Sequence, residues 1–261
     1  MIKREFKVNL KSFILWTSIL IAIFLVVFVV YPFIMTDESM ESLNDMMKVF
    51  PPELLKSFNI DLANINTAYG WLKSEGFMFV LIIIGLYGSI MGYNMVLKEE
   101  YDKTIEYLVF LPIKRSKIMT NKIIVSLVYI IGMTLLLGLF NYIALLISGD
   151  FNQSEYLLLS ITPIFIALPL FSLNLFISTF TRKKNIGISL GLVFLFYVIN
   201  IISTLSDKIE FLKFFSIYTL ADTRGIMEST KYNPVCIIVS IIITIVFITL
   251  SYIRYNKKEL I

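Results

Sequence analysis

The chain has 261 residues and a formal net charge of +4, and 57% of its residues are hydrophobic while only 16% are charged. An average soluble domain is about 25% charged, and a water-soluble fold of this length could not bury so much apolar surface, so the composition predicts an integral membrane protein. The chain contains no histidine and a single cysteine, Cys236. These counts exclude an internal disulfide, a His-based zinc site and a Ser/His/Asp triad.

Six long stretches carry no Asp, Glu, Lys or Arg and come close to the length of about 20 residues that a membrane-crossing helix needs. The expected spans are 12–36, 77–97, 123–149, 156–181, 185–206 and 234–253. The predicted fold class is therefore an all-α integral membrane protein with six transmembrane helices in a single domain, residues 1–261. The first span is far longer than the apolar core of a secretory signal and no small-residue cleavage site follows it, so we expect a retained anchor.

The residues before the first span combine an apolar stripe at helical spacing with a stripe of lysines. The apolar stripe is Ile2, Phe6, Leu10 and Phe13, and the lysines are Lys3, Lys7 and Lys11. This pattern favours an amphipathic helix at the membrane interface. The alternative is an ordinary basic flank of the first span, which the positive-inside rule also produces.

The distribution of basic residues predicts the orientation of the spans. Of the 23 Lys and Arg residues, 16 lie in 1–11, 98–122, 182–184 and 254–258, which are the alternate connections of a six-span chain. Cytoplasmic connections carry the excess of positive charge, so both termini are expected in the cytoplasm of a cell that holds this protein in its plasma membrane. The net charge is then a sign of topology and not of nucleic-acid binding.

Two connections on the predicted outer side are long enough to have structure of their own. They are 37–76 and 207–234. In the second, Ile209, Leu212, Phe215 and Tyr218 recur every three residues, which predicts a short amphipathic helix that rests on the bilayer surface or dips into it.

Two pairs of glycines are spaced for close contact between membrane helices. They are Gly88 with Gly92 and Gly187 with Gly191. Pro163 and Pro169 are expected to bend the fourth span and to free backbone carbonyls.

Two absences narrow the functions that the spans can perform. The predicted spans contain no charged side chain, and such side chains usually mark the pathways of proton- or sodium-coupled carriers. No glycine is followed by lysine, so the phosphate-cradling loop GxxxxGK[ST] is absent. If ATP drives this protein, another chain must bind the nucleotide.

The connection 98–122 carries the most informative pattern. An apolar stripe at helical spacing runs through Tyr101, Ile105, Leu108 and Leu111, and Pro112 ends it. An amphipathic helix between two spans on the cytoplasmic side is typical of a docking element for a partner. The alternative is a helix that lies on lipid and has no partner.

This connection resembles a pattern that follows the second span in permeases of the ABC-2 type exporter family. The matching residues are Glu99, Thr104, Glu106, Leu108, Pro112, Ile113, Arg115, Ile118 and Lys122. Val109 replaces a second leucine of the pattern, and Lys103 stands where a glycine often precedes the threonine. The six spans and the basic amphipathic N-terminus extend the resemblance over nearly the whole chain.

The resemblance implies a half-transporter, in which two permeases, identical or homologous, sit over two ATPase subunits that bind ATP and Mg²⁺. It also implies that the helix between spans two and three is a coupling helix held by the ATPase. The residues expected at or near that contact are Glu99, Thr104, Ile105, Glu106, Leu108, Pro112 and Arg115. Of these, Glu106 and Arg115 would make charged contacts, while Ile105 and Leu108 would anchor the helix; no catalytic, cofactor-binding or metal-binding residue is expected in this chain.

Other functions remain open at this stage. An intramembrane hydrolase is suggested by Glu99 and Glu100, but Thr104 stands where the arginine of that motif is needed, and the required histidines are missing. A membrane scaffold or an immunity protein without a link to ATP predicts that 98–122 binds nothing in the cytoplasm. For an exporter, the aromatic content of 15% suits a hydrophobic or amphipathic cargo such as a peptide, an antimicrobial or a drug.

Overall fold

A computed structural model describes residues 2–34, 42, 45, 49–50, 67–101, 113–181, 185–205 and 207–258. Over these residues the chain is helical, and six helices are long and apolar enough to cross a membrane, which confirms the predicted number. These are α1 (Ile2–Ile34), α5 (Phe77–Tyr101), α7 (Arg115–Ser148), α8 (Gln153–Ser178), α9 (Ile186–Leu205) and α11 (Pro234–Lys257). Shorter elements are α4 (Ala68–Trp71), the π-helix η1 (Leu72–Gly76), the 3₁₀ helices η2 (Asp207–Phe215) and η3 (Ile217–Ala221), and α10 (Thr223–Ser229).

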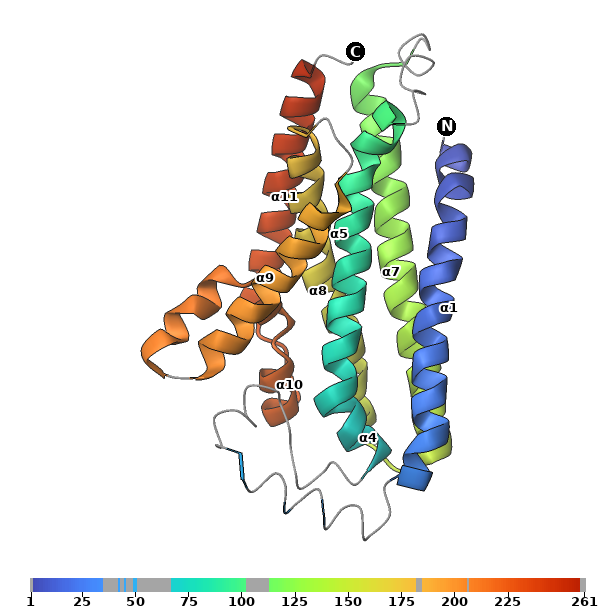
Figure 1. Cartoon of the computed structure of the whole chain (residues 1–261), viewed down its shortest axis with the longest axis vertical. Coiled ribbons are helices and arrows are strands. Elements are labelled where there is room, and N and C mark those ends of the chain that lie inside the picture. Colours follow the sequence, from blue (N-terminus) through green and yellow to red (C-terminus); the bar gives the residue numbers. More distant parts are fainter. Residues whose placement is uncertain are drawn as a thin grey trace.

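The first turn of α1 and the last turn of α11 lie at the same end of the bundle, which we call the terminal end (Figure 1). The opposite end, which carries α4 and α10, is the distal end. At the distal end, side chains cap the helices: Asn152 accepts a hydrogen bond from the backbone N–H of Glu155, and Asn233 accepts one from Val235. Such caps satisfy backbone donors that the first turn leaves without an intrahelical partner.

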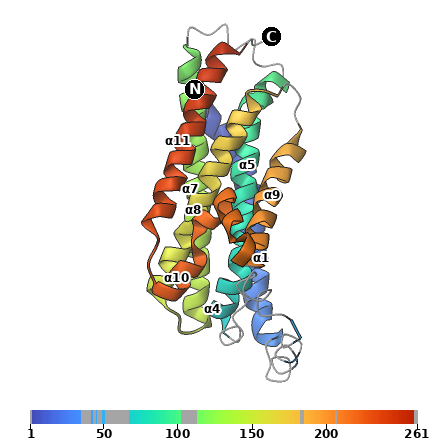
Figure 2. The same cartoon turned by 90° about the vertical axis from the view of Figure 1, so that its left-hand side faces the viewer.

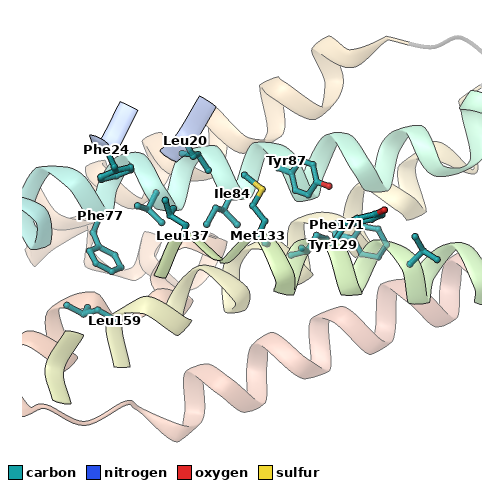
Figure 3. Close-up of a cluster of buried hydrophobic side chains, with 14 of the residues drawn as sticks. Leu20, Phe24, Phe77, Ile84, Tyr87, Tyr129, Met133, Leu137, Leu159 and Phe171 are labelled. Carbon is teal, nitrogen blue, oxygen red and sulfur yellow. The ribbon is translucent and has the colours of Figure 1, made fainter. Parts of the chain in front are cut away.

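The helices α5 and α8 occupy the centre of the bundle in both views (Figures 1 and 2). About 61% of the apolar window of α5 and 56% of that of α8 are buried, compared with 17% for α1, α9 and α11. The main hydrophobic core joins α5 and α7, with Leu20 and Phe24 reaching it from α1 (Figure 3). The three outer helices therefore leave wide apolar faces for lipid or for another subunit.

The central crossing depends on glycine. A Cβ atom placed on Gly92 of α5 would lie 2.1 Å from the carbonyl oxygen of Phe171 in α8, and one on Gly88 would lie 2.9 Å from that of Ala167. The predicted close contact at Gly88 and Gly92 is thus confirmed. The second predicted pair is different, because a Cβ atom on Gly191 would meet none of the described residues within 4 Å; that glycine makes no close helix contact in the part of the chain that the structure describes.

Both prolines of the fourth span lie inside α8, and the structure shows how the carbonyls that they free are satisfied. Pro169 leaves the carbonyl of Phe165 without its usual donor. The hydroxyl Oγ of Ser240, in α11, donates a hydrogen bond to this carbonyl at 2.9 Å. The carbonyl of Leu159, freed by Pro163, accepts a hydrogen bond from Oγ1 of Thr162 at 2.8 Å. A proline in one helix therefore creates a binding point for its neighbour.

The helices extend beyond several of the apolar windows predicted from the sequence. The most marked case is α1, which runs without a break through the basic segment and the first span. A helix of this length is about 50 Å long, well above the hydrocarbon thickness of about 30 Å. The amphipathic N-terminus predicted as a separate interfacial helix is therefore the first part of α1.

The connection between α9 and α11 folds back into the bundle. The helix η2 runs beside the distal half of α9 (Figure 1). The helix η3 follows it and contacts α8, α9 and α11. Oγ of Ser216 donates a hydrogen bond at 2.6 Å to the carbonyl of Phe196, which lies halfway along α9. The Tyr218 ring packs 5.5 Å from that of Tyr197. The predicted helix is present as 3₁₀ helix, and its C-terminal part packs against the bundle. Its position relative to the bilayer surface stays a prediction.

Candidate functional site

Three charged side chains meet at the terminal end of the bundle. Nζ of Lys122, in the second turn of α7, lies 2.9 Å from Oε1 of Glu99 in α5 and 3.3 Å from Oε2 of Glu5 in α1. Each of the three side chains is 10% exposed or less. Charges buried this deeply are stable only when they are paired, because both ions have given up hydration. The triad Glu5–Lys122–Glu99 therefore holds α1, α5 and α7 together at this end.

The triad joins the two ends of the connection 98–122, which carries the sequence motif. Glu99 and Lys122 are the first and the last residues of the motif described above, and their ion pair brings its two ends together. Residues 102–112 between them, which include the predicted contact residues Thr104, Ile105, Glu106, Leu108 and Pro112, lie outside the described residues. The coupling helix predicted there stays a prediction, whereas the helix ends on either side of it, Tyr101 of α5 and Arg115 of α7, are defined.

Arg115 is held by its own chain. Its Nη1 atom donates a hydrogen bond at 2.9 Å to the backbone carbonyl of Lys258, just after α11. Nζ of Lys258 in turn donates to the carbonyl of Thr181, just after α8, at 3.2 Å. Arg115 thus ties the start of α7 to the ends of α8 and α11. Its predicted role in contacting a partner is not tested by this arrangement.

Glu5 was not among the residues predicted from the sequence. The signal that points to it is local: it is the only acidic residue in a segment that is otherwise strongly basic. Two contacts fix its helix against α7, because Oη of Tyr129 donates to the carbonyl of Phe6 at 2.6 Å and the rings of Phe13 and Tyr129 lie 4.8 Å apart. These contacts place Glu5 beside Lys122.

A cavity of about 360 Å³ opens beside the triad, between α1 and α5. Its walls include Glu5, Glu99 and Lys122 themselves. It exists because α1 packs mainly on α7 and touches α5 little. Its size falls in the range of about 300–1,000 Å³ that is usual for ligand pockets.

Among the described residues, the distal end has a buried ion pair of its own. Nζ of Lys73, in η1, lies 3.6 Å from Oε1 of Glu155 in α8. Beside this pair, Nζ of Lys73 lies 5.7 Å from the centroid of the Tyr69 ring. Tyr69 belongs to a cluster with Tyr142, Phe151 and Tyr156, whose ring centroids lie 5.6–6.4 Å apart. Burial raises the pKa of the Tyr69 phenol far above its ordinary value, and the nearby Glu155 carboxylate raises it further. Tyr69 is therefore neutral throughout the physiological range.

Within the described residues, no three His, Cys, Asp or Glu side chains are grouped so that they could hold a metal ion. The charged groups at both ends of the bundle are pairs of opposite sign, and their arrangement suits the positioning of helices. Neither cluster combines a nucleophile with a base.

Six membrane-crossing helices with buried ion pairs at their ends define a multi-pass α-helical membrane protein. The family model described as 'ABC-2 family transporter protein' matches residues 1–260. The chain therefore belongs to this family of transport membrane components. Comparisons with curated proteins and with solved structures gave no significant match.

Proposed function

We propose that the chain is the permease subunit of an ATP-driven exporter, and that separate ATPase subunits bind the connection 102–112 at the terminal end. On this proposal the terminal end faces the cytoplasm, the protein resides in the plasma membrane, and two permeases assemble with two ATPases. The family membership supports the transport role. The observation that carries the link to an ATPase is the Glu99–Lys122 ion pair, which joins the two ends of the proposed docking segment.

The geometry around this pair suits the transmission of movement. A segment whose two ends are joined moves as a unit, so a displacement of 102–112 would reach α5 through Glu99 and α7 through Lys122. Glu5 passes part of the displacement to α1. From α5 it reaches α8 through the tight crossing at Gly92. Small movements at one site are amplified when packed elements can only move as rigid bodies.

The proposed cargo is a hydrophobic or amphipathic peptide, an antimicrobial or a drug. The wide apolar faces of α1, α9 and α11 offer a surface along which such a molecule can pass between two permeases. The short elements described at the distal end leave the path without a large docking domain on that side in the described part of the chain.

Two alternatives make different predictions. A scaffold or immunity protein without a link to ATP would bind no ATPase through 102–112. An intramembrane hydrolase that uses Glu99 is disfavoured, because this carboxylate is paired with Lys122 and lies 2.9 Å from its Nζ atom.

The test is co-purification of the tagged protein in mild detergent, with the associated chains identified by mass spectrometry. The variant Glu106→Arg/Leu108→Asp reverses a charge and places a carboxylate in the apolar stripe of the docking segment, so it should lose the ATPase. Glu228→Arg, which reverses an exposed charge in α10, is the control and should keep it. If the folded wild-type protein binds no ATPase at near-native expression, the exporter proposal is wrong and the scaffold or immunity function takes its place.

A further inference from the structure

The cavity between α1 and α5 has a layered lining. Arg4 and Lys98 lie at its mouth, at the terminal end of the bundle; Asn9 and Asn94 follow, and Trp16 and Met91 line its deeper part. Charged side chains thus line the terminal end of the cavity on both helices, amides follow together with apolar Val8 and Met95, and the deeper part is mostly apolar. A membrane phospholipid has the matching order of a charged phosphate, ester groups and acyl chains.

The charge at the mouth favours an anion. The walls carry three cations and two carboxylates, and both carboxylates are turned to Lys122. Among the residues that the structure describes, Arg4 and Lys98 have no carboxylate partner. Cations close to a membrane surface attract anionic headgroups with about 1 kcal/mol each.

The depth of the cavity corresponds to one leaflet. Twelve residues separate Arg4 from Trp16 along α1, which is about 18 Å at the rise of an α-helix. Eleven residues separate Lys98 from Tyr87 along α5, which is about 16 Å. Half of a hydrocarbon core of about 30 Å is about 15 Å. The Trp16 and Tyr87 rings, with centroids 6.2 Å apart, close the deep end.

The amide layer contains a polar atom that the described residues leave unsatisfied. Oδ1 of Asn94 is buried and has no hydrogen-bond partner among them. Asn94 lies one turn below Lys98, about 6 Å deeper, which is the level of the glycerol and ester groups of a lipid whose phosphate sits at the mouth. Buried polar atoms are rarely left without a partner. Oδ1 only accepts hydrogen bonds and ester groups have no donor, so its partner at this level would be a water molecule, while the amide Nδ2 of Asn94 can donate to an ester oxygen.

We propose that this cavity binds one anionic phospholipid, with its phosphate at Arg4 and Lys98 and an acyl chain beside Trp16 and Met91. The assignment of this lipid to the cytoplasmic leaflet rests on the orientation proposed above. The binding itself does not, because the lining residues are fixed by the fold. The lipid would fill the gap between α1 and α5 next to the Glu5–Lys122–Glu99 triad.

The test uses the fluorescence of Trp16. The chain has two tryptophans, so Trp71→Phe leaves Trp16 as the only one. The purified protein is placed in nanodiscs of phosphatidylcholine that contain increasing fractions of phosphatidylglycerol with brominated acyl chains, which quench nearby tryptophan. Brominated phosphatidylcholine in place of the phosphatidylglycerol measures the quenching by bulk lipid. The assay contains no ATPase, so its outcome is independent of the outcome for the proposed function.

We expect brominated phosphatidylglycerol to reach half-maximal quenching at an about thirtyfold lower fraction than brominated phosphatidylcholine, since two cations at the mouth favour the anion by about 1 kcal/mol each. Arg4→Gln/Lys98→Gln should abolish this preference. Lys3→Gln/Lys7→Gln removes the same charge from exposed positions of α1 that do not line the cavity, and it should keep the preference. Thermal unfolding of both variants checks that they are folded.

Three results would overturn the proposal. Equal quenching by both lipids would show that the cavity does not select an anionic headgroup, and would leave it to an amphipathic cargo. An equal loss in the Lys3/Lys7 variant would show general attraction to the basic N-terminus. Relief of quenching by millimolar glycerol phosphate would show a site for the headgroup anion alone, which needs no lipid.

Discussion

The two ends of the bundle both contain a buried lysine paired with a glutamate, but the pairs are built differently. At the terminal end, Lys122 of α7 pairs with Glu5 of α1 and Glu99 of α5, so it joins three long helices, including the two that flank residues 102–112. At the distal end, Lys73 joins the short helix η1 to α8 inside an aromatic cluster, at the longer distance of 3.6 Å. The first pair joins the two helices that flank residues 102–112, whereas the second pair fixes a local contact. On the proposed function, only the first pair lies where movement of a docking segment would enter the membrane helices.

The largest expected effect comes from removing the shared cation of the terminal end. Lys122→Gln leaves Glu5 and Glu99 buried beside each other without a positive charge, which should lower the free energy of unfolding by about 3–5 kcal/mol. Unfolding in mixed micelles measures it. Lys117→Gln, at an exposed position of the same helix, is the control and should change little. Equal stabilities of the two variants would contradict the role given to the triad.

A second change opens the crossing of α5 and α8, the two central helices that run between the ends of the bundle. Gly92→Ala places a methyl group 2.1 Å from the carbonyl oxygen of Phe171, and the α5–α8 crossing must open to accept it. The expected loss in the free energy of unfolding is about 2–3 kcal/mol. Gly191→Ala meets open space and should be neutral or slightly stabilising, because alanine favours the helix by about 1 kcal/mol. If both variants unfold alike, the crossing is looser than the structure shows.

The two carboxylates of the triad allow a sharper comparison within the terminal end. Glu99→Gln removes the nearer partner of Lys122 and should cost about 2 kcal/mol, in the range of hydrogen bonds to charged groups. Glu5→Gln removes the partner at 3.3 Å and should cost less. The same unfolding assay applies, and a larger loss for Glu5→Gln than for Glu99→Gln would reverse the order that the distances predict.

The smallest effect is expected at the distal end. Lys73→Gln removes a pair that is 3.6 Å long and whose lysine is 14% exposed, so a loss of about 1 kcal/mol is expected. Co-purification of the ATPase should be unchanged, because the distal end is far from the proposed docking segment. Lys231→Gln, at an exposed position near α10, is the matched control. Loss of the ATPase in the Lys73 variant alone would show that the two ends are not functionally distinct.

The number of spans could be predicted from the sequence because apolar windows of the right length are a local property. Their limits could not, since a charge normally ends a predicted span. Glu99 and Lys122 can be buried inside helices because each neutralises the other, and that pairing exists only in three dimensions. The sequence indicated that Pro169 frees a carbonyl of α8, but not that Ser240 would bind it.

The candidate site was predicted in part. The motif led to Glu99 and Arg115, and the structure places both at the terminal end of the bundle. Glu5, the second carboxylate on Lys122, is 117 residues away from that lysine, and the carbonyl of Lys258 is 143 residues away from Arg115. No local pattern connects residues at such separations, so the triad and the cavity beside it required the fold.

The proposed function requires an ATPase to bind residues 102–112, whose two ends the Glu99–Lys122 pair joins. Site-specific photo-crosslinking tests it most directly, with benzoylphenylalanine placed at Ile105 and, as the distal comparison, at the exposed Phe211. In native membranes, we expect a crosslink from position 105 to a P-loop ATPase, identified by mass spectrometry, and none from position 211. A complex that co-purifies with an ATPase but gives no crosslink from position 105, or gives one from position 211, would contradict it.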